Sequence, residues 1–174
     1  MPKWKLMGRA FIPTTIVRLY YLRKHGAIIS ARAEVDIAPD TDWGPGCVIS
    51  SFTKIKISGP FVMGRGVQIA TGCFIGTGRA GLTMGDHVLI SPNCSIIGSN
   101  YRFDRLDVPL TEQGTVSKGI RIGHGVWLGA NSVVLDGAEI GDNVIVSAGS
   151  VVSGRIERNS IVQGNPCKII FTRR

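Results

Sequence analysis

The chain has 174 residues, of which 44% are hydrophobic and 18% are charged, a balance that fits one globular domain and excludes a disordered chain. The net charge of +8 indicates anionic partners, which include nucleic acid, a membrane surface and phosphate-bearing small molecules. The 23 glycines lack a three-residue period, so they exclude collagen and require many turns.

The N-terminal residues 4–25 follow a helical pattern, with Pro13 suited to a first turn and Gly26 to the stop. The apolar stretch from Phe11 to Leu22 contains Pro13 and Arg18 and no small-residue cleavage site, so it predicts neither a signal peptide nor a bilayer span. We expect a basic helical cap within residues 1–26, packed on the end of the core. A peripheral membrane contact is the alternative interpretation, prompted by basic residues beside aromatic ones: Lys3, Lys5, Arg9, Arg18, Arg23 and Lys24 with Trp4, Phe11, Tyr20 and Tyr21.

Further along the chain, apolar residues recur every six positions. The runs are Ile37, Trp43, Ile49 and Ile55; Ile57, Met63, Ile69 and Ile75; Met84, Ile90 and Ile96; and Ile122, Leu128, Val134, Ile140, Val146 and Val152. Six is not a helical period, and each glycine in a helix would cost up to about 1 kcal/mol. Short strands joined at corners fit instead. The apolar residue and the small residue two positions before it then point to the same side, and three such sides close a coil that buries its interior by stacking.

Six in-phase units followed by "GNPCKII" at Gly164–Ile170 resemble the hexapeptide-repeat acyltransferases, especially the galactoside, maltose and polysaccharide-biosynthesis O-acetyltransferases. The resemblance implies an all-β fold, a left-handed parallel β-helix over residues 27–174, with a C-terminal tail at 156–174. It also implies a homotrimer with sites between subunits, acetyl-CoA as the donor and no metal. The expected function is O-acetylation of a sugar hydroxyl in cell-surface polysaccharide synthesis, in the cytoplasm or at the inner face of the membrane.

One long interruption separates the repeats. Ile96 and Ile122 are 26 residues apart, so residues 98–119 are predicted to form an extruded loop. Its apolar residues Tyr101, Phe103, Leu106, Val108 and Leu110 indicate that it packs on a neighbour. In the similar acetyltransferases such a loop reaches an adjacent subunit near the active site. A loop that only supports the trimer is the alternative.

The resemblance places the expected catalytic base at this loop. In the family a histidine follows "SPN" and precedes a stretch like "RYED". Here "ISPN" ends at Asn93 and "RFD" begins at Arg102, but Tyr101 stands in the histidine position. A phenol with a pKa of about 10 is almost fully protonated at neutral pH. Three accounts follow: an altered base, a protein that binds the donor without catalysis, or an alignment shifted by a residue or two, although Ser99–Arg105 contains no histidine.

The predicted site therefore has Tyr101 as catalytic residue, His124 as a possible substitute, and Asn93, Asn100 and Arg102 at the acceptor. His87 and His124 fall at turn positions, where a solvent-facing corner residue is the simpler interpretation, and His25 falls at a helix end. For the donor, the resemblance indicates small residues that admit the pantetheine arm to backbone amides, and basic residues that face its phosphates. These positions are Trp127, Gly129, Ala130, Ser147, Ala148, Arg155 and Lys168, with Gly149 beside them.

Other functions are less well supported by the sequence. A non-catalytic trimer that binds coenzyme A or a glycan is the main rival, favoured by Tyr101. A zinc site of the carbonic-anhydrase kind needs three histidines, and only two fall in the repeats. The cysteines Cys47, Cys73, Cys94 and Cys167 have no CxxC spacing, so we expect buried thiols. Nucleic-acid binding would rest on charge alone, and we expect none.

Overall fold

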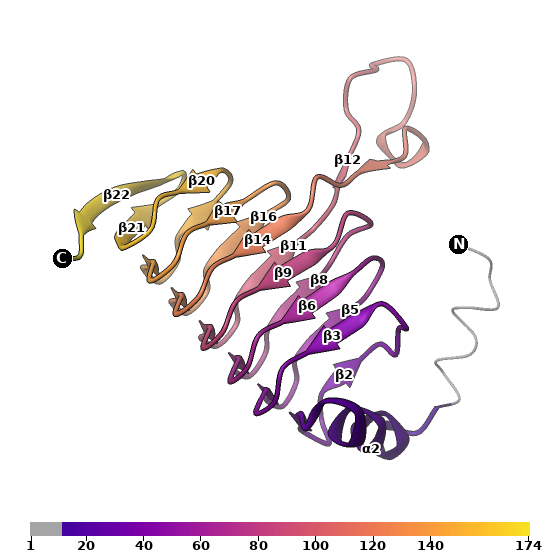
Figure 1. Ribbon diagram of the computed structural model, residues 1–174. Helices are drawn as coiled ribbons and strands as arrows, with labels where there is room; N and C mark the ends of the chain where they lie inside the picture. The colour runs from indigo at the N-terminus through magenta and orange to yellow at the C-terminus, as the bar shows by residue number, and fades with distance from the viewer. Residues whose placement is uncertain (1–11) are drawn as a thin grey trace.

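The computed structural model describes residues 12–174, and it shows a solenoid of three parallel sheets with one helix at its N-terminal end (Figure 1). The predicted helical residues 4–11, together with Lys3, lie outside the described residues. Sheet A contains β1 (Ile28–Ile29), β4 (Val48–Ile49), β7 (Gln68–Ile69), β10 (Leu89–Ile90), β15 (Trp127–Leu128), β18 (Ile145–Val146), β21 (Ser160–Gly164) and β22 (Cys167–Thr172). All its strands are parallel except β22, which returns antiparallel along β21.

The other two sheets complete each coil. Sheet B contains β2 (Glu34–Val35), β5 (Lys54–Lys56), β8 (Phe74–Gly76), β11 (Ser95–Ile97), β16 (Val133–Leu135) and β19 (Val151–Val152). Sheet C contains β3 (Thr41–Trp43), β6 (Phe61–Met63), β9 (Leu82–Met84), β14 (Ile120–Ile122), β17 (Glu139–Ile140) and β20 (Arg155–Ile156). The predicted all-β β-helix is confirmed. It extends through β21 and β22, within the segment 156–174 that was predicted as a tail.

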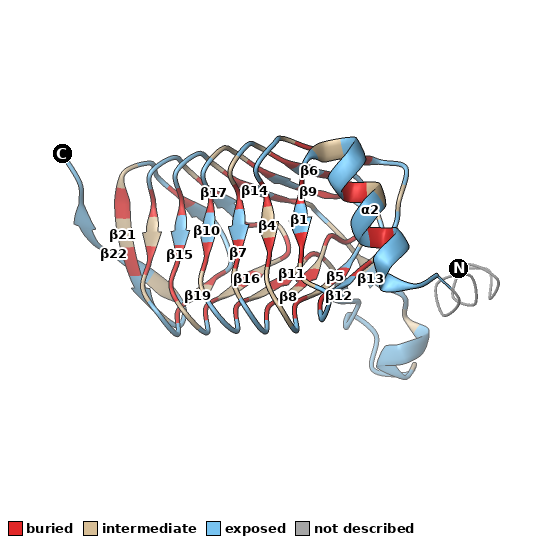
Figure 2. Cartoon of the chain, turned by 90° about the horizontal axis from the view of Figure 1, so that it is seen from below, coloured by how far each residue is buried: buried red, intermediate tan, exposed pale blue. Residues whose placement is uncertain are grey.

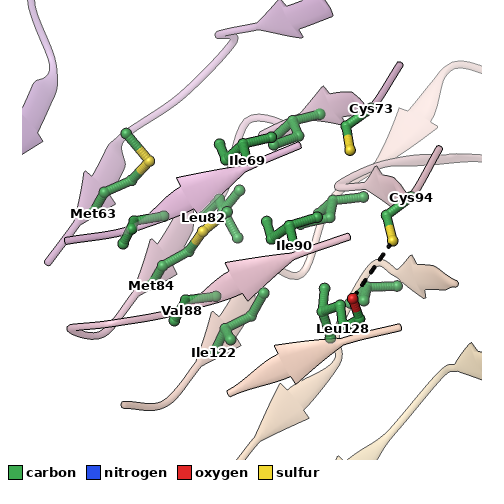
Figure 3. Close-up of a cluster of buried hydrophobic side chains, with 14 of the residues drawn as sticks. Met63, Ile69, Cys73, Leu82, Met84, Val88, Ile90, Cys94, Ile122 and Leu128 are labelled. Atoms are coloured by element: carbon green, nitrogen blue, oxygen red, sulfur yellow. Dashed lines mark hydrogen bonds between the residues drawn. The ribbon is translucent and has the colours of Figure 1, made fainter. Parts of the chain in front are cut away.

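The core is a column of side chains inside the prism, and strands alternate buried and exposed residues as a period of two requires (Figure 2). Ile69, Ile90 and Leu128 stack in register through sheet A, and Met63, Met84 and Ile122 do so through sheet C (Figure 3). The predicted small inward residues are also fully buried: Val126, Ser132, Ala138, Val144 and Ser150. Cys47, Cys73 and Cys94 occupy such small positions and are buried, whereas Cys167 is only half-buried.

Two residues of the predicted inward set point elsewhere. Ile37 is 39% exposed and Ile57 is only partly buried. In the coil that contains Ile57, the inward residues of sheets B and C are Ile55, Phe61 and Met63. The corner between these sheets is longer in the early coils than the six-residue period allows, so a residue in phase with Met63 falls into the corner instead of the core.

The helix α2 (Thr14–His25) closes the N-terminal end of the solenoid (Figure 1). It ends at Gly26, which adopts the left-handed conformation (φ 63°) that glycine reaches at little cost. Tyr21 is fully buried and stacks on Trp43, with 4.2 Å between ring centroids. As predicted, His25 is at the helix end, where its Nδ1 lies 3.3 Å from the backbone nitrogen of Trp43. The described helix thus packs on the core as a cap.

The predicted extruded loop is present between β11 and β14. It projects away from the coils (Figure 1), with a short antiparallel ladder of β12 (Asn100–Tyr101) and β13 (Thr115–Val116) at its base and a 3-10 turn, η1 (Leu110–Glu112). Its apolar side chains are exposed: Tyr101 by 55%, Phe103 by 78% and Leu106 fully. These side chains are available to another molecule.

No helix among residues 12–174 is both long and apolar enough to cross a membrane.

Candidate functional site

The corners of the prism form three edges along which equivalent residues of successive coils lie above one another. The A–B edge includes the four-residue corners 30–33, 50–53, 70–73, 91–94, 129–132 and 147–150, and the C–A edge includes 44–47, 64–67, 85–88, 123–126 and 141–144. The loop 98–119 leaves the solenoid at the B–C edge. The predicted site residues distribute over these edges.

Most of the predicted donor residues lie on the A–B edge, in two successive corners. The amide of Gly129 donates to the carbonyl of Val146 (2.8 Å), and the amide of Gly149 donates to the carbonyl of Ala130 (2.9 Å), so the two corners stack closely. The amides of Ala130 and Ala148, at the second position of each corner, have no acceptor among residues 12–174. Two unused donors therefore lie one above the other on this edge.

Glycine is favoured at Gly129 and at Gly149 for different structural reasons. A Cβ on Gly129 would lie 2.6 Å from the nitrogen of Ala148, so glycine is required there by the close approach of the next coil. A Cβ on Gly149 would meet nothing within 4 Å, but its φ of +71° favours glycine. The space beside Gly149 is open, whereas that beside Gly129 is filled by backbone.

The A–B edge continues into the C-terminal turn. The amide of Gly164 donates to the hydroxyl of Ser150 (3.1 Å), which brings the turn between β21 and β22 to the edge directly after the second corner. Lys168 follows this turn and is exposed. Arg155, by contrast, lies on sheet C and pairs with Glu157 (3.1 Å), so of the two predicted basic residues it is Lys168 that lies close to this edge.

Trp127 and Asn93 lie near the same edge. Trp127 points outward from sheet A with 46% of its surface exposed, and its Nε1 donates to the hydroxyl of Ser91 (2.9 Å). Asn93 is exposed at a corner position with φ 58°, a conformation that asparagine tolerates. Neither is needed by the core.

Tyr101, Asn100 and Arg102 lie together at the base of the loop, on the B–C edge. Tyr101 pairs with Thr115 across the short ladder, and the amide of Arg102 donates to the carbonyl of Gly114 (3.0 Å). The Tyr101 hydroxyl has no hydrogen-bond partner within the described part of the chain. The Tyr101 side chain is 55% exposed, so the hydroxyl is accessible to another molecule.

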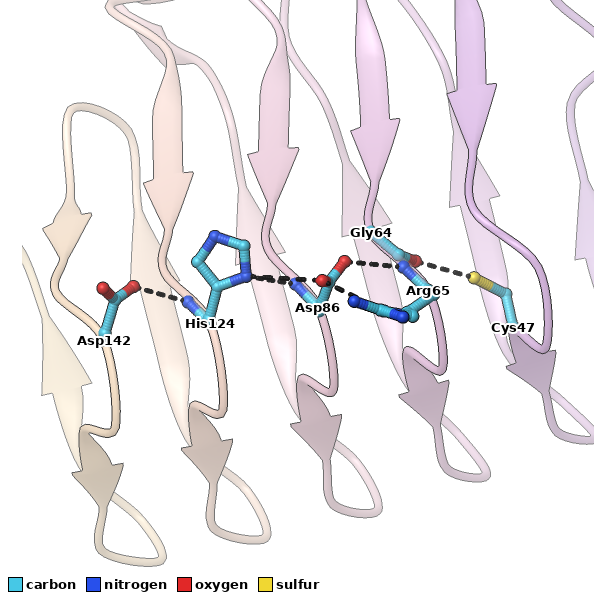
Figure 4. Close-up of polar contacts among 6 residues, drawn as sticks. All are labelled: Cys47, Gly64, Arg65, Asp86, His124 and Asp142. Atoms are coloured by element: carbon cyan, nitrogen blue, oxygen red, sulfur yellow. Dashed lines mark hydrogen bonds and ion pairs between the residues drawn. The ribbon is translucent and has the colours of Figure 1, made fainter.

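His124 lies on the third edge, C–A, within a ladder of polar contacts (Figure 4). The amide of Asp86 donates to Nδ1 of His124 (3.0 Å), and the amide of His124 donates to Oδ1 of Asp142 (2.7 Å). Donation into Nδ1 requires the neutral ring with its proton on Nε2, although Nδ1 also lies 3.8 Å from a carboxylate oxygen of Asp86. This directed contact occupies Nδ1, whereas Nε2 has no hydrogen-bond partner among residues 12–174. As predicted, His87 and His124 are both exposed corner residues.

The same ladder orders the acidic residues. The amide of Arg65 donates to Asp86 (2.9 Å) and its guanidinium pairs with the same carboxylate (3.3 Å). The amide contact, followed by the guanidinium, lowers the pKa of Asp86 below its ordinary value. On the C–A edge, side chains thus accept hydrogen bonds from the amides of Arg65, Asp86 and His124. The equivalent amides of Ala130 and Ala148 on the A–B edge have no acceptor among residues 12–174.

Within one chain, the predicted residues do not converge. The donor residues except Arg155 lie at the A–B edge, as does Asn93. Tyr101 with Asn100 and Arg102 lies on the B–C edge, and His124 lies on the C–A edge. Residues 12–174 contain no cluster of three or more possible metal ligands. The sequence interpretation named Ala130 and Ala148 as small residues beside the donor, and the structure adds that their amides have no acceptor among residues 12–174. An alanine side chain is too short to reach the neighbouring coil.

Comparison with known families and sequences agrees with this architecture. The family model "Bacterial transferase hexapeptide (six repeats)" matches residues 119–154. The galactoside O-acetyltransferase of Escherichia coli is 37% identical over 90 residues, which cover 51% of this chain and 43% of the relative. A putative lipopolysaccharide biosynthesis O-acetyl transferase of the same organism is 32% identical over 122 residues, covering 70% of this chain and 55% of the relative. The chain therefore spans about half the length of these two curated relatives.

Among solved structures, an N-acyltransferase from Bacillus cereus superposes with a TM-score of 0.77 and 21% identity, over 90% of this chain and 88% of the other. Its crystals contained dTDP and coenzyme A. This likeness concerns the fold. In repeat sequence and in architecture, the chain resembles the hexapeptide-repeat acyltransferases.

Proposed function

We propose that this protein binds an acyl-coenzyme A along the A–B edge and transfers its acyl group, by preference acetyl, to a hydroxyl of a saccharide. The single observation that carries the proposal is the pair of unused amides at Ala130 and Ala148. A free N–H on a surface of small residues is a donor for the peptide-like carbonyls of a pantetheine arm. Relatives named as acetyltransferases support the same reaction class.

The rest of the donor would follow the same edge. Lys168 lies where the edge meets the C-terminal turn, and its ammonium is suited to the nucleotide phosphates. Trp127 offers an exposed ring beside the edge for apolar parts of the donor. Both side chains are exposed, and neither serves the core.

In the transfer step, the acceptor hydroxyl oxygen attacks the thioester carbonyl carbon. A carbon–oxygen ester bond forms, the carbon–sulfur bond breaks, and coenzyme A leaves as a thiolate that takes up a proton. A positioned group must accept the hydroxyl proton as the new bond forms. Tyr101 stands where the resemblance places this group, with Asn100 and Arg102 beside it, whereas His124 lies on another edge with its Nδ1 accepting the amide of Asp86.

The site requires more than one copy of the chain, because Tyr101 and the free amides lie on different edges of the prism. The exposed apolar loop residues Phe103 and Leu106 provide surface for contact between copies. We propose a homotrimer in which the loop of one subunit approaches the A–B edge of the next. A role in lipopolysaccharide or other cell-surface polysaccharide synthesis is the biological setting that the second relative suggests.

A non-catalytic protein that holds coenzyme A or a glycan is the second candidate, favoured by one specific observation. The Tyr101 hydroxyl has no partner in the described chain that would help it lose a proton. On this account donor binding persists and transfer does not occur.

The experiment combines donor affinity with product detection. Calorimetry measures acetyl-CoA binding, and mass spectrometry detects acetylated product over a panel of saccharides. Ala148→Pro or Ala130→Pro removes one free N–H at a corner position where Pro92 already stands, so the backbone is compatible. We expect affinity to fall about threefold to tenfold, the value of one hydrogen bond.

Ser51→Pro is the matched control, because Ser51 has the same corner position in a coil far from Ala130. It should leave donor affinity unchanged. Wild-type affinity that survives both alanine variants would overturn the donor site. Tight binding without product over the whole panel would favour the non-catalytic candidate.

A further inference from the structure

The helix α2 has an apolar stripe that faces away from the core. Ile12, just before the helix, and Ile16, Leu19 and Leu22 within it are exposed by 41%, 56%, 45% and 51%. At about 100° per residue, Leu19 lies opposite Val17 and Tyr21, which are the buried residues of the helix, and Ile16 and Leu22 lie on either side of Leu19. Figure 2 shows the helix with its outer surface exposed. A shallow hollow on this stripe is lined by Ile16, Leu19, Tyr20, Arg23 and Lys24.

The charged residues of α2 are all of one sign. The helix contains Arg18, Arg23 and Lys24 and no acidic residue. Arg23 lies on the apolar side, exposed, and none of the three basic residues has an ion pair among residues 12–174. The basic groups therefore flank the stripe without a partner of opposite charge in the described chain.

The stripe is held in place by the other side of the helix. Arg18 donates through Nε to the carbonyl of Ile29 (2.7 Å), and the Tyr21 hydroxyl donates to the carbonyl of Asp36 (2.7 Å). With the Tyr21–Trp43 stack, these contacts fix the rotation of α2 on the first coil. The apolar side cannot turn inward without breaking them.

We propose that α2 docks the protein on an anionic membrane surface, with the stripe inserted at the headgroup boundary and Arg23 and Lys24 on the lipid phosphates. Apolar area together with basic residues is what holds an amphipathic helix in a bilayer interface. Each basic residue near an anionic leaflet adds to the electrostatic attraction. A second copy of the same face is a poorer partner, because it would bring like charges together. The sequence before the helix adds Lys3, Lys5 and Arg9 to the same end of the chain.

Co-sedimentation of the full chain with vesicles tests the proposal. The protein should bind phosphatidylglycerol–phosphatidylcholine vesicles and not phosphatidylcholine vesicles, with affinity that falls as salt rises. Ile16→Glu with Leu19→Glu should abolish binding, and Arg23→Glu with Lys24→Glu should lower the partition constant by about tenfold or more. Circular dichroism verifies that each variant is folded.

Matched controls separate this face from general surface charge. Ile170→Glu changes an apolar residue that is 57% exposed at the other end of the solenoid, and Lys56→Glu with Arg79→Glu makes the same change of net charge away from α2. Both should keep most of the binding. Equal loss in controls and α2 variants would overturn the proposal, as would a wild-type protein that ignores anionic vesicles.

Sedimentation velocity without vesicles tests whether a second copy of the chain binds the stripe instead of a membrane. If Ile16→Glu with Leu19→Glu reduces the oligomeric state, the stripe is an interface between copies and the membrane proposal is wrong. Acetyl-CoA affinity, measured without lipid, reports on the A–B edge separately. The docking surface and the proposed function can therefore fail independently.

Discussion

Substitution of Gly129 and of Gly149, both on the A–B edge, separates a glycine needed by coil packing from a glycine needed by a turn. In Gly129→Ala, the new Cβ would lie 2.6 Å from the nitrogen of Ala148, 2.7 Å from the carbonyl oxygen of Val146 and 3.0 Å from the Cα of Ala148. Non-bonded carbon contacts are normally about 3.5–4.0 Å, so the neighbouring backbone must move by roughly 1 Å. In Gly149→Ala, the Cβ enters open space.

The expected magnitudes differ because the causes differ. Overpacking costs about 1–3 kcal/mol and a weakened Gly129–Val146 hydrogen bond about 1 kcal/mol more, so we expect Gly129→Ala to destabilise by about 2–4 kcal/mol. Gly149→Ala places alanine at a φ of +71°, which costs about 1–2 kcal/mol, partly offset by the lower entropy of the unfolded chain. We expect a net cost of about 1 kcal/mol.

Thermal melting by circular dichroism checks both values. For a chain of this length each kcal/mol lowers the Tm by roughly 2–4 °C, so the expected losses are about 4–16 °C for Gly129→Ala and about 2–4 °C for Gly149→Ala. Calorimetry with acetyl-CoA should show weaker binding for Gly129→Ala alone, because only that change displaces the amide of Ala148. Equal Tm losses, or a greater loss in Gly149→Ala, would refute the packing explanation.

Three further changes test other parts of the molecule. Tyr101→Phe should lower the transfer rate by about 100-fold or more, and Tyr101→His should retain or raise this rate. Both variants should keep the donor affinity unchanged. An unaffected rate in Tyr101→Phe would show that the phenol takes no part in the reaction. Trp127→Ala should lower the free energy of unfolding by less than about 1.5 kcal/mol, because the ring is 46% exposed and makes one hydrogen bond, to Ser91. The same change should weaken donor binding in calorimetry. Unchanged affinity would mean that Trp127 has no role in donor binding. Burial, and then the charge of Lys24, lower the pKa of His25 below 6.5 in the folded protein, so the unfolded chain binds more protons there. The contribution of His25 to stability is therefore complete above pH 6.5 and declines as pH falls below it. His25→Asn should flatten this part of a Tm–pH profile, and an unchanged slope would assign the slope to other groups.

The sequence predicts the core well because inward residues obey two simple rules. Each residue of the six-residue period must be apolar, and the residue two positions before it must be small enough to stack. The pairs that satisfy these rules, Ser132 with Val134 and Ala138 with Ile140, are fully or almost fully buried. The rules fail at Ile37 and Ile57, which are in phase but lie near corners. Corner length depends on how the chain turns between sheets B and C, and periodicity carries no information about it.

The arrangement of the site was less predictable. Sequence spacing brought Tyr101 and His124 into one hypothesis because the loop 98–119 rejoins the solenoid just before His124. In the folded chain one complete strand, β14, separates the end of the loop from His124, so the two residues lie on different edges. Which edges of two subunits meet is a property of assembly, and the period of one chain does not encode it.

The contrast between two edges leads to a last prediction. At the second corner position of the C–A edge, a side chain accepts the amide from the coil before it, as Asp142 does for His124 (2.7 Å). A glycine beneath makes room, since a Cβ on Gly123 would lie 2.4 Å from Oδ1 of Asp142. The A–B edge has the same arrangement of Gly129 beneath Ala148, but alanine cannot accept a hydrogen bond. Ala148→Asp should therefore occupy the free amide of Ala130 and stabilise the fold by about 1 kcal/mol.

The same substitution should weaken acetyl-CoA binding, because the amide that the pantetheine arm would use is then taken. Ala148→Asn is the neutral counterpart, and it separates loss of the amide from repulsion of the donor phosphates. If the amide matters, both variants bind more weakly and both melt higher than wild type. A higher Tm with unchanged affinity in both would mean that the Ala130 amide faces only water, and the donor would have to lie on another edge. The C–A edge shows that the fold can readily supply an acceptor for the amide at this corner position. An amide N–H left without an acceptor on a packed repeat is therefore a testable sign of a ligand.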